Sequence, residues 1–196
     1  TMRDRAIAFV PASGRQCTTL STMFGSHLQG MPIIAENGTY VVRDGVDISS
    51  STIDPNLTRE VITGVRQLRN DGHDVGLVVA TKSIAYLERG DDPFVSHVAT
   101  YYHSHRIVKD LSEHTDDVIK LSIYDFREAS EATYPTMQRT APEHQVILAT
   151  PNWVDIMNPG VNKGSAVEAV QRDLGVTADQ TAIFGDFLND LEMMPM

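Results

Sequence analysis

Strand-like apolar runs alternate with helical patterns at both ends of this chain, and this alternation constrains its fold more than any other feature. The run 7–10 predicts a strand, apolar spacing over 20–28 predicts a helix, and the run 31–35 predicts a second strand. Towards the other end, apolar residues at helical spacing over 167–174 precede a strand-like run at 181–184. Such alternation is typical of an α/β fold with parallel strands.

The middle of the chain has strand and helix patterns of its own. Asp44-Gly45 between two β-prone runs predicts a hairpin, and apolar residues at helical spacing follow Pro55. The remaining predicted elements are a strand at 75–80, a helix at 94–102, a strand at 118–124, a helix at 127–139 and strands at 145–149 and 153–157.

We therefore predict an α/β protein with a discontinuous core and an insertion. Residues 1–46 and 158–196 would form the core, and residues 47–157 would form an inserted α+β domain. The sequence contains no internal repeat and no low-complexity linker that would suggest a different division.

Composition narrows the classes of function. A net charge of −10 argues against a broad basic surface for nucleic acid or for an anionic membrane. No apolar stretch reaches the roughly 18 residues that span a bilayer. Cys17 is the only cysteine, so no intrachain disulfide can form and a cytoplasmic location is expected. The sequence leaves the oligomeric state open.

Four polar motifs follow predicted strands or begin a predicted helix. They are Ala12-Ser13-Gly14-Arg15, Ala35-Glu36-Asn37-Gly38, Asn162-Lys163-Gly164 and the run from Gly185 to Asp190. The carboxyl ends of parallel strands are where ligands bind in open α/β sheets, so a carboxylate there can reach a metal or a phosphate.

Each motif also has an ordinary structural interpretation. Lys163 could be a solvated surface residue, Asp186 a turn residue, and Asn189 a helix cap followed by a favourable first-turn Asp190. Asn37-Gly38 is interpreted as a structural turn. The pair His103 and His105 lacks a third ligand at suitable spacing, so a surface or packing role is favoured over a metal site.

In this order, the four motifs resemble those of the haloacid dehalogenase (HAD) superfamily, specifically the Cof-like sugar-phosphate phosphatases with a large α/β cap. The resemblance covers essentially the whole chain. It implies a Rossmann-like doubly wound core, a cap that excludes water and selects the substrate, and magnesium-dependent hydrolysis of a phosphate ester through an aspartyl phosphate. The implied partner is a small phosphorylated metabolite, with sugar phosphates favoured.

The resemblance also assigns roles to residues near the carboxyl end. Lys163 matches the lysine that contacts both the phosphate and the nucleophile, and Asp190 matches the residue that orients this lysine. Asp186 matches the carboxylate that binds Mg²⁺, a metal that prefers hard oxygen ligands. Asn189 matches a hydrogen-bonding residue of the phosphate site.

The first motif supplies the remaining implied site residues. Ser13 matches the hydroxyl that binds the transferring phosphoryl group, with the Gly14 amide beside it. Arg15 is placed near the boundary between core and cap, where it would meet the substrate. A lone Ser-Gly-Arg is usually just a turn, and its position after a predicted strand is what favours these roles.

One family motif is absent from the sequence. The family's Asp-x-Asp-Gly-Thr loop carries the nucleophile and the general acid/base, but no two of the seventeen aspartates here are separated by a single residue. The family also continues with a further strand and helix beyond the point where this sequence stops. We therefore expect the sequence to be a fragment of a larger gene product, with weak metal binding and no phosphatase turnover by itself.

Three functional hypotheses remain at this stage. The first is a metabolite phosphatase whose nucleophile lies outside the sequence. The second is a catalytically inactive HAD-like binding or interaction protein. The third keeps the superfamily but changes the reaction, to that of a phosphomutase or a disaccharide-phosphate phosphatase. The specific substrate depends on cap loops whose shape a sequence does not reveal.

Overall fold

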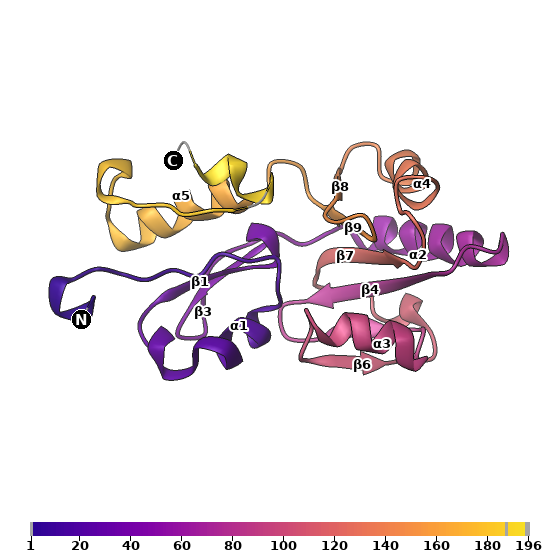
Figure 1. Cartoon of the computed structure of the whole chain (residues 1–196), viewed down its shortest axis with the longest axis horizontal. Helices are drawn as coiled ribbons and strands as arrows, with labels where there is room; N and C mark the ends of the chain where they lie inside the picture. The colour runs from indigo at the N-terminus through magenta and orange to yellow at the C-terminus, as the bar shows by residue number, and fades with distance from the viewer. Residues whose placement is uncertain (1, 187, 195–196) are drawn as a thin grey trace. The chain divides into compact units, whose positions relative to one another are not determined.

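The chain divides into two compact units in the computed structural model, which describes residues 2–186 and 188–194. The first unit contains Thr1–Ser51 and Gly160–Met196, and the second contains Thr52–Pro159 (Figure 1). Both boundaries differ from the predicted ones. Strand β3 (Val46–Ser50) pairs with β2 inside the first unit, and the Asn158 side chain donates to the Thr52 carbonyl inside the second, at 2.8 Å.

The first unit is built on a three-stranded antiparallel sheet in the order β1-β2-β3. Strands β1 (Pro32–Ala35) and β2 (Tyr40–Arg43) are joined by the one-turn helix η3 (Glu36–Gly38). The predicted hairpin between β2 and β3 is confirmed, with Asp44 and Gly45 at φ values of 49° and 80°. Positive φ at both central residues gives the turn a twist that matches the strands.

Helices cover and flank this sheet. The first is α1 (Cys17–Phe24), which η2 (Gly25–Leu28) extends, and the second is α5 (Lys163–Leu174). Val167 and Val170 of α5 pack with Ile34 and Val41 of the sheet in one apolar cluster. Short 3-10 helices complete the unit, namely η1 (Arg3–Arg5), η5 (Ala178–Gln180) and η6 (Leu188–Met193).

Two strands predicted for the first unit are wrong. Residues 7–10 and 181–184 have no strand hydrogen bonding, and Phe184 is 89% exposed. Near the first of these runs, Ala12 forms a parallel bridge to Ile34. A strand needs a hydrogen-bonded neighbour along its length, and the described residues provide neither run with one. The chain is a mixed α/β protein as predicted, but among the described residues of this unit parallel pairing is limited to that bridge.

The second unit is built on a six-stranded sheet in the order β6-β5-β4-β7-β9-β8. Every neighbouring pair is antiparallel except β5 and β6. The strands are β4 (Val75–Thr81), β5 (Ala85–Leu87), β6 (His105–Ile107), β7 (Val118–Asp125), β8 (Gln145–Leu148) and β9 (Trp153–Met157). The predictions for β4, β7, β8 and β9 are confirmed, whereas the three-residue β5 and β6 were missed.

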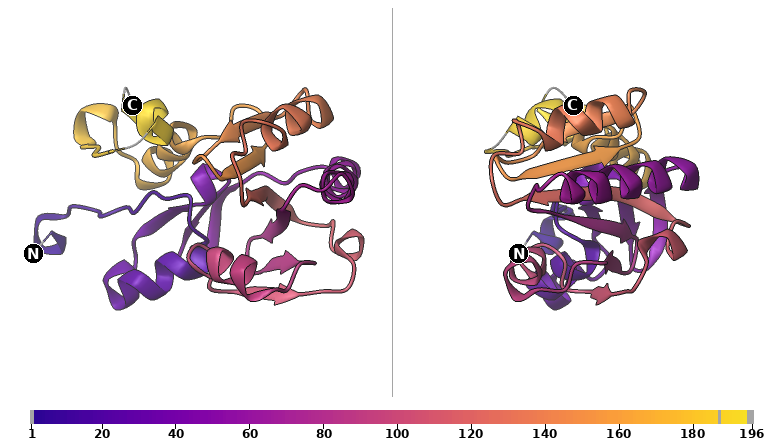
Figure 2. Two further views of the ribbon diagram at one scale, coloured as in Figure 1. Left: turned by 45° about the vertical axis from the view of Figure 1, so that its right-hand side comes forward. Right: turned by 90° about the vertical axis from the view of Figure 1, so that its right-hand side faces the viewer.

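Helices pack on both faces of this sheet (Figure 2). Helices α2 (Pro55–Asn70) and α4 (Thr133–Thr140) share an apolar cluster with one face, and α3 (Asp92–Ala99) shares another with the opposite face. The short η4 (Leu111–Glu113) joins the first cluster through Leu111. Asp54 caps α2 by accepting from the Asn56 amide at 2.7 Å.

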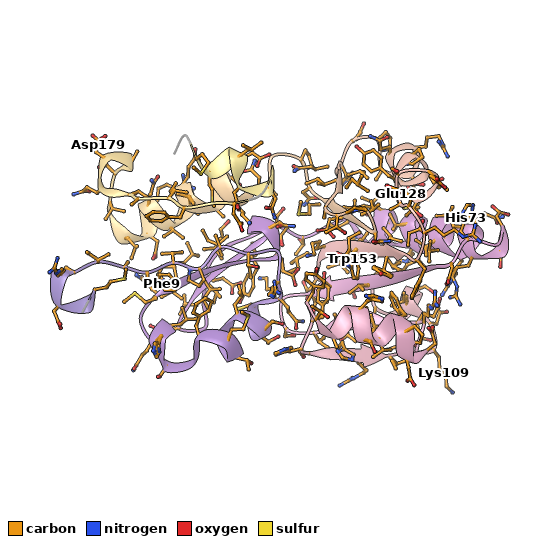
Figure 3. The ribbon with its side chains drawn as sticks, in the orientation of Figure 1. Phe9, His73, Lys109, Glu128, Trp153 and Asp179 are labelled. Atoms are coloured by element: carbon orange, nitrogen blue, oxygen red, sulfur yellow. The ribbon has the colours of Figure 1, made fainter. Side chains whose placement is uncertain are left out.

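Helix α4 begins later than predicted. The segment 127–132 forms turns, because the Asp125 carboxylate accepts from the Arg127 amide at 2.9 Å and from the Thr133 hydroxyl at 2.6 Å. On the sheet itself, the Trp153 ring (labelled in Figure 3) packs with Tyr124. Their ring centroids are 4.9 Å apart. No helix in the described part of the chain is long and apolar enough to cross a membrane.

Candidate functional site

The amino terminus of α5 places one lysine in a buried, electropositive position. Asn162 caps the helix by accepting from the Ser165 amide at 2.9 Å, and the Ser165 hydroxyl accepts from the Asn162 amide at 3.1 Å. Lys163 is the first helical residue and is only 5% exposed. The free amides and the dipole at a helix amino terminus favour an anion there, and the ammonium group adds to that preference.

Lys163 is held by a buried carboxylate. Its Nζ donates to Asp190 Oδ1 at 2.5 Å, and Asp190 is 6% exposed. The other oxygen, Oδ2, accepts from the Asp186 amide at 3.0 Å. A buried ammonium is stable when it is paired and hydrogen-bonded, and Asp190 provides Lys163 with such a partner.

Gly164 lets the η6 turn approach α5 this closely, and Gly185 lets the chain before η6 pass close to Asp190. A Cβ on Gly164 would lie 2.2 Å from the Glu192 carbonyl oxygen, and one on Gly185 would lie 2.5 Å from the Asp190 Cβ. No side chain fits at such distances without moving the main chain. The Gly185–Asp190 motif therefore packs directly against the start of α5, although its Phe187 lies outside the described residues.

The Ser13-Gly14-Arg15 loop is fastened to β1 and to the turn after it. The Ser13 amide donates to the Ile34 carbonyl at 3.0 Å, and the Glu36 amide donates to the Arg15 carbonyl at 3.0 Å. The Arg15 amide donates to Ser13 Oγ at 3.2 Å. Ser13, Gly14 and Arg15 are all half-buried, so the loop is ordered but accessible.

Asn37 links this loop to the η6 turn. Its Oδ1 accepts from Asn189 Nδ2 at 3.1 Å, across 152 positions of sequence. The backbone N–H of Asn37 donates to the Ser13 carbonyl at 3.0 Å. A Cβ on Gly14 would lie 2.8 Å from Asn37 Oδ1. Sequence reasoning counted Asn37-Gly38 among the motifs of the family resemblance but kept it as a structural turn, with no site role. A contact between such distant residues leaves no local signal in a single sequence.

The structure thus gathers the predicted site residues into two linked sets. Lys163, Asp190 and Asp186 are joined directly by hydrogen bonds. The second set is formed by the Ser13 loop and Asn189, which meet through Asn37. Glycine at position 38 also belongs here, because its φ is 99° and a Cβ would lie 2.3 Å from the Asn162 carbonyl oxygen.

A complete metal cage is not formed by the described residues. They contain no group of three or more His, Cys, Asp or Glu side chains that could hold an ion. Asp186 is exposed and provides one carboxylate, a ligand of the type that Mg²⁺ prefers. The donor set is therefore incomplete for a metal site, and no chemical step can be assigned to a metal from these residues.

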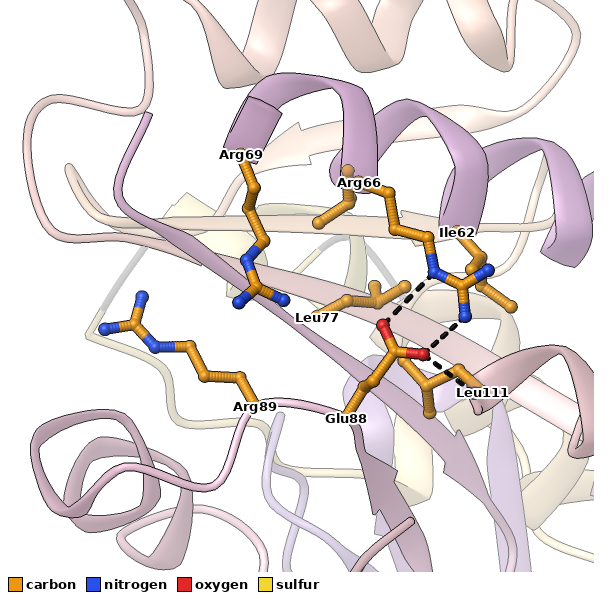
Figure 4. Close-up of a pocket in the computed structure, with 8 residues that line it drawn as sticks. Ile62, Arg66, Arg69, Leu77, Glu88, Arg89 and Leu111 are labelled. Carbon is orange, nitrogen blue, oxygen red and sulfur yellow. Dashed lines mark hydrogen bonds and ion pairs between the residues drawn. The ribbon is translucent and has the colours of Figure 1, made fainter. Parts of the chain in front are cut away.

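The second unit has a small cavity beside an arginine network (Figure 4). Arg66 donates to Glu88 and, at 2.7 Å, to Asp110. Hydrogen bonds from Arg66 hold the pKa of Glu88 below its usual value. The cavity volume is about 10 Å³, which suits a single water molecule. This cavity is too small for a metabolite, so the site in the first unit is the better candidate.

Comparison with known proteins shows the family to which the chain belongs. A family model described as haloacid dehalogenase-like hydrolase matches residues 1–196, and the chain belongs to this family. The curated protein 5-amino-6-(5-phospho-D-ribitylamino)uracil phosphatase YbjI from Escherichia coli (strain K12) is 27% identical over 199 residues, which cover 98% of this chain and 70% of YbjI.

Solved structures share the fold. A haloacid dehalogenase-like hydrolase from Bacteroides thetaiotaomicron superposes with a TM-score of 0.83 at 19% identity, over 98% of this chain and 74% of that one. A structure described as the HAD subclass IIB sugar phosphatase BT4131 superposes with a TM-score of 0.76 at 18% identity, over 98% and 72% of the two chains. At these identities the likeness concerns the fold.

Proposed function

We propose that this chain carries the phosphate site of a Cof-like phosphatase that hydrolyses small phosphorylated metabolites, with sugar phosphates as the favoured class. The observation that carries the proposal is the buried Lys163–Asp190 pair at the amino terminus of α5. Membership of the hydrolase family supports it. So do the printed descriptions of two similar proteins, one a phosphatase of a phosphoribityl compound and the other a sugar phosphatase.

The chemistry of the site suits a phosphoryl group. A phosphate dianion needs donors and positive charge to offset its own charge and that of a carboxylate nucleophile. Lys163 has three N–H donors and uses one for Asp190. The Ser13 hydroxyl and the Gly14 amide would add neutral donors from the facing loop. Arg15 would contact the substrate beyond its phosphate.

The nucleophile and the cofactor belong to the proposal as well. Because the sequence has no Asp-x-Asp pair, the aspartyl phosphate would form on a residue outside these 196 positions. Mg²⁺ is proposed as the cofactor on the basis of family membership, with Asp186 as one ligand. It would supply charge neutralisation at the transferring phosphoryl group.

The two units would then have separate roles. Thr1–Ser51 with Gly160–Met196 would act as the core that binds phosphate, and Thr52–Pro159 as the cap that selects the substrate. A cytoplasmic location, without nucleic acid or membrane as a partner, fits the net charge of −10 and the single cysteine.

A second candidate is a phosphate-binding protein without turnover. The observation that favours it is again the absence of an Asp-x-Asp pair in the sequence. Reading the gene upstream of Thr1 separates the two candidates. An in-frame Asp-x-Asp-Gly-Thr segment supports the phosphatase, and a stop codon or unrelated sequence there supports the binding protein.

The activity test uses the gene product that includes such an upstream segment. Release of inorganic phosphate is measured with Mg²⁺ and a panel of hexose, pentose and ribityl monophosphates. Lys163→Met should lower turnover about 100-fold or more, as expected for the loss of a charged group at the transferring phosphoryl. Lys109→Met, which changes an exposed lysine of the second unit (Figure 3), is the matched control and should leave turnover unchanged.

Two results would contradict the phosphatase proposal. Equal turnover in the wild type and in Lys163→Met would mean that Lys163 has no role in turnover, and the proposal depends on that role. Conversion of a sugar monophosphate into an isomer, without free phosphate, would identify a phosphomutase instead.

A further inference from the structure

The turn after β1 has an unusual backbone. Glu36, Asn37 and Gly38 all have positive φ, at 52°, 58° and 99°. Glycine adopts this region freely, and asparagine tolerates it better than most residues. The geometry of the turn therefore explains Gly38 and is compatible with Asn37. It does not require a hydrogen-bond acceptor on the side chain at position 37, since glycine would satisfy the same φ.

The Asn37 side chain nevertheless makes specific long-range contacts. It is 8% exposed, and its Oδ1 accepts from Asn189 Nδ2 at 3.1 Å. The same oxygen lies so close to Gly14 that a Cβ there would be 2.8 Å away. One buried oxygen thus lies beside two of the segments from which the proposed phosphate donors come, the Ser13 loop and the η6 turn.

We propose that Asn37 is a positioning residue for the phosphate site, and that it acts by orienting the side-chain amide of Asn189. This inference rests on the proposed function of the site. A primary amide has two N–H donors. Because Asn37 accepts one of them, the plane of the Asn189 amide is set, and its second N–H is available to a phosphoryl oxygen.

The contact with Gly14 gives Asn37 a second effect on the same site. The backbone N–H of Asn37 donates to the Ser13 carbonyl at 3.0 Å, while the Asn37 side chain packs against Gly14. The loop that would donate to phosphate and the turn that carries Asn189 are consequently kept in one relative arrangement. Donors held in place before the ligand arrives lose less entropy on binding.

The test measures binding of inorganic phosphate to the full 196-residue chain by isothermal titration calorimetry. Asn37→Gly removes the side chain at a position whose φ glycine accepts. The loss of one orienting hydrogen bond should weaken phosphate binding about 3- to 10-fold. In an Asn189→Ala background the same substitution should change the affinity less than about 2-fold, because the side chain that Asn37 orients is gone.

Two further variants complete the design. Asn70→Gly, at the exposed last residue of α2, is the matched control and should leave phosphate affinity unchanged. Asn37→Asp keeps an acceptor oxygen and tolerates positive φ. In nuclear magnetic resonance spectra, Asn37→Gly should shift the Asn189 side-chain amide signals, and Asn37→Asp should restore them towards their wild-type positions.

Any one of the following results would overturn the inference. Equal weakening by Asn37→Gly in both backgrounds would mean that Asn37 acts on the fold and not through Asn189. Unchanged phosphate affinity in Asn37→Gly would mean that Asn37 does not affect phosphate binding. Unshifted Asn189 amide signals would mean that Asn37 does not orient the Asn189 side chain. If Asn37→Gly fails to fold, the test uses Asn37→Asp alone. Asn189 side-chain amide signals in Asn37→Asp that differ from those of the wild type would then contradict the inference. A wild-type chain that binds no phosphate would refute the proposed function, and the amide signals alone would then decide the role of Asn37.

Discussion

Removing the Asp190 carboxylate should destabilise the first unit strongly. Asp190→Ala deletes the acceptor of Lys163 Nζ, at 2.5 Å, and the acceptor of the Asp186 amide, at 3.0 Å. Lys163 remains only 5% exposed, so its ammonium cannot regain full hydration without movement of the helix terminus. Breaking a buried ion pair by removing one partner costs about 3–5 kcal/mol. That is a large share of a typical domain stability of about 5–15 kcal/mol.

An exposed ion pair in the same helix provides the control. Arg172 and Glu168 lie one turn apart with a 3.7 Å separation, and their side chains are 71% and 51% exposed. Such pairs contribute less than about 1 kcal/mol. Glu168→Ala should therefore have a small effect. A second substitution, Lys163→Met on top of Asp190→Ala, should recover part of the loss because it removes the isolated buried charge.

Two natural probes report on the units separately during urea unfolding. Cys17, the single cysteine, lies in α1 of the first unit and can be followed by thiol labelling. Trp153, the single tryptophan, lies in the second unit and can be followed by fluorescence. With a slope of about 2 kcal/mol per molar urea, Asp190→Ala should lower the midpoint seen by Cys17 by about 2 M.

The reasoning would be refuted by a small or a misplaced effect. A loss below about 1 kcal/mol, similar to that of Glu168→Ala, would mean that the pair is not effectively buried. Strictly additive effects of Asp190→Ala and Lys163→Met would mean that the two groups do not interact. A shift in the Trp153 transition alone would place the effect in the wrong unit.

Three other predictions concern the turn, the pH dependence and the activity. Gly38→Ala should destabilise the chain by more than about 2 kcal/mol, because φ is 99° and the new Cβ would meet main chain; Gly45→Ala, at φ 80° in open space, should cost only about 1 kcal/mol, and similar urea midpoints for the two would contradict this. Folding lowers the pKa of Glu88, so the ionised carboxylate stabilises the second unit above the ordinary pKa of 4.5, and this stabilisation should be lost as the pH falls and the folded form protonates. In Glu88→Gln, the urea midpoint measured by fluorescence should depend less on pH in that range. The 196-residue chain alone should release no phosphate even with Mg²⁺, and sustained release that Lys163→Ala abolishes would prove this wrong.

Elements with local signals were predicted well. Helix α5 has an Asn162 cap at its start and a left-handed Gly175 at its end, and both signals lie within a few residues of the boundary. The Asp44-Gly45 hairpin has the same property. Each of these features depends on the conformation of one short segment, so one sequence is enough to predict it.

Elements that depend on distant partners were predicted poorly. The runs 7–10 and 181–184 have strand-like composition but find no neighbouring strand among the described residues. The three-residue strands β5 and β6 are too short for a periodic signal and form because the edge of the sheet is available to them. Pairing is a property of the assembled sheet, and composition is only a weak guide to it.

The sequence by itself determined the α/β class, and it predicted a division into two parts and a set of site residues, because spacing and motif order are properties of the chain. Only the tertiary structure decided how deeply the expected Lys163–Asp190 pair is buried, that Gly164 lets the last turn touch α5, and that Asn37 meets Asn189. These contacts join segments far apart in sequence. They exist only after the sheet and α5 have packed, since burial and hydrogen bonding depend on which surfaces come together.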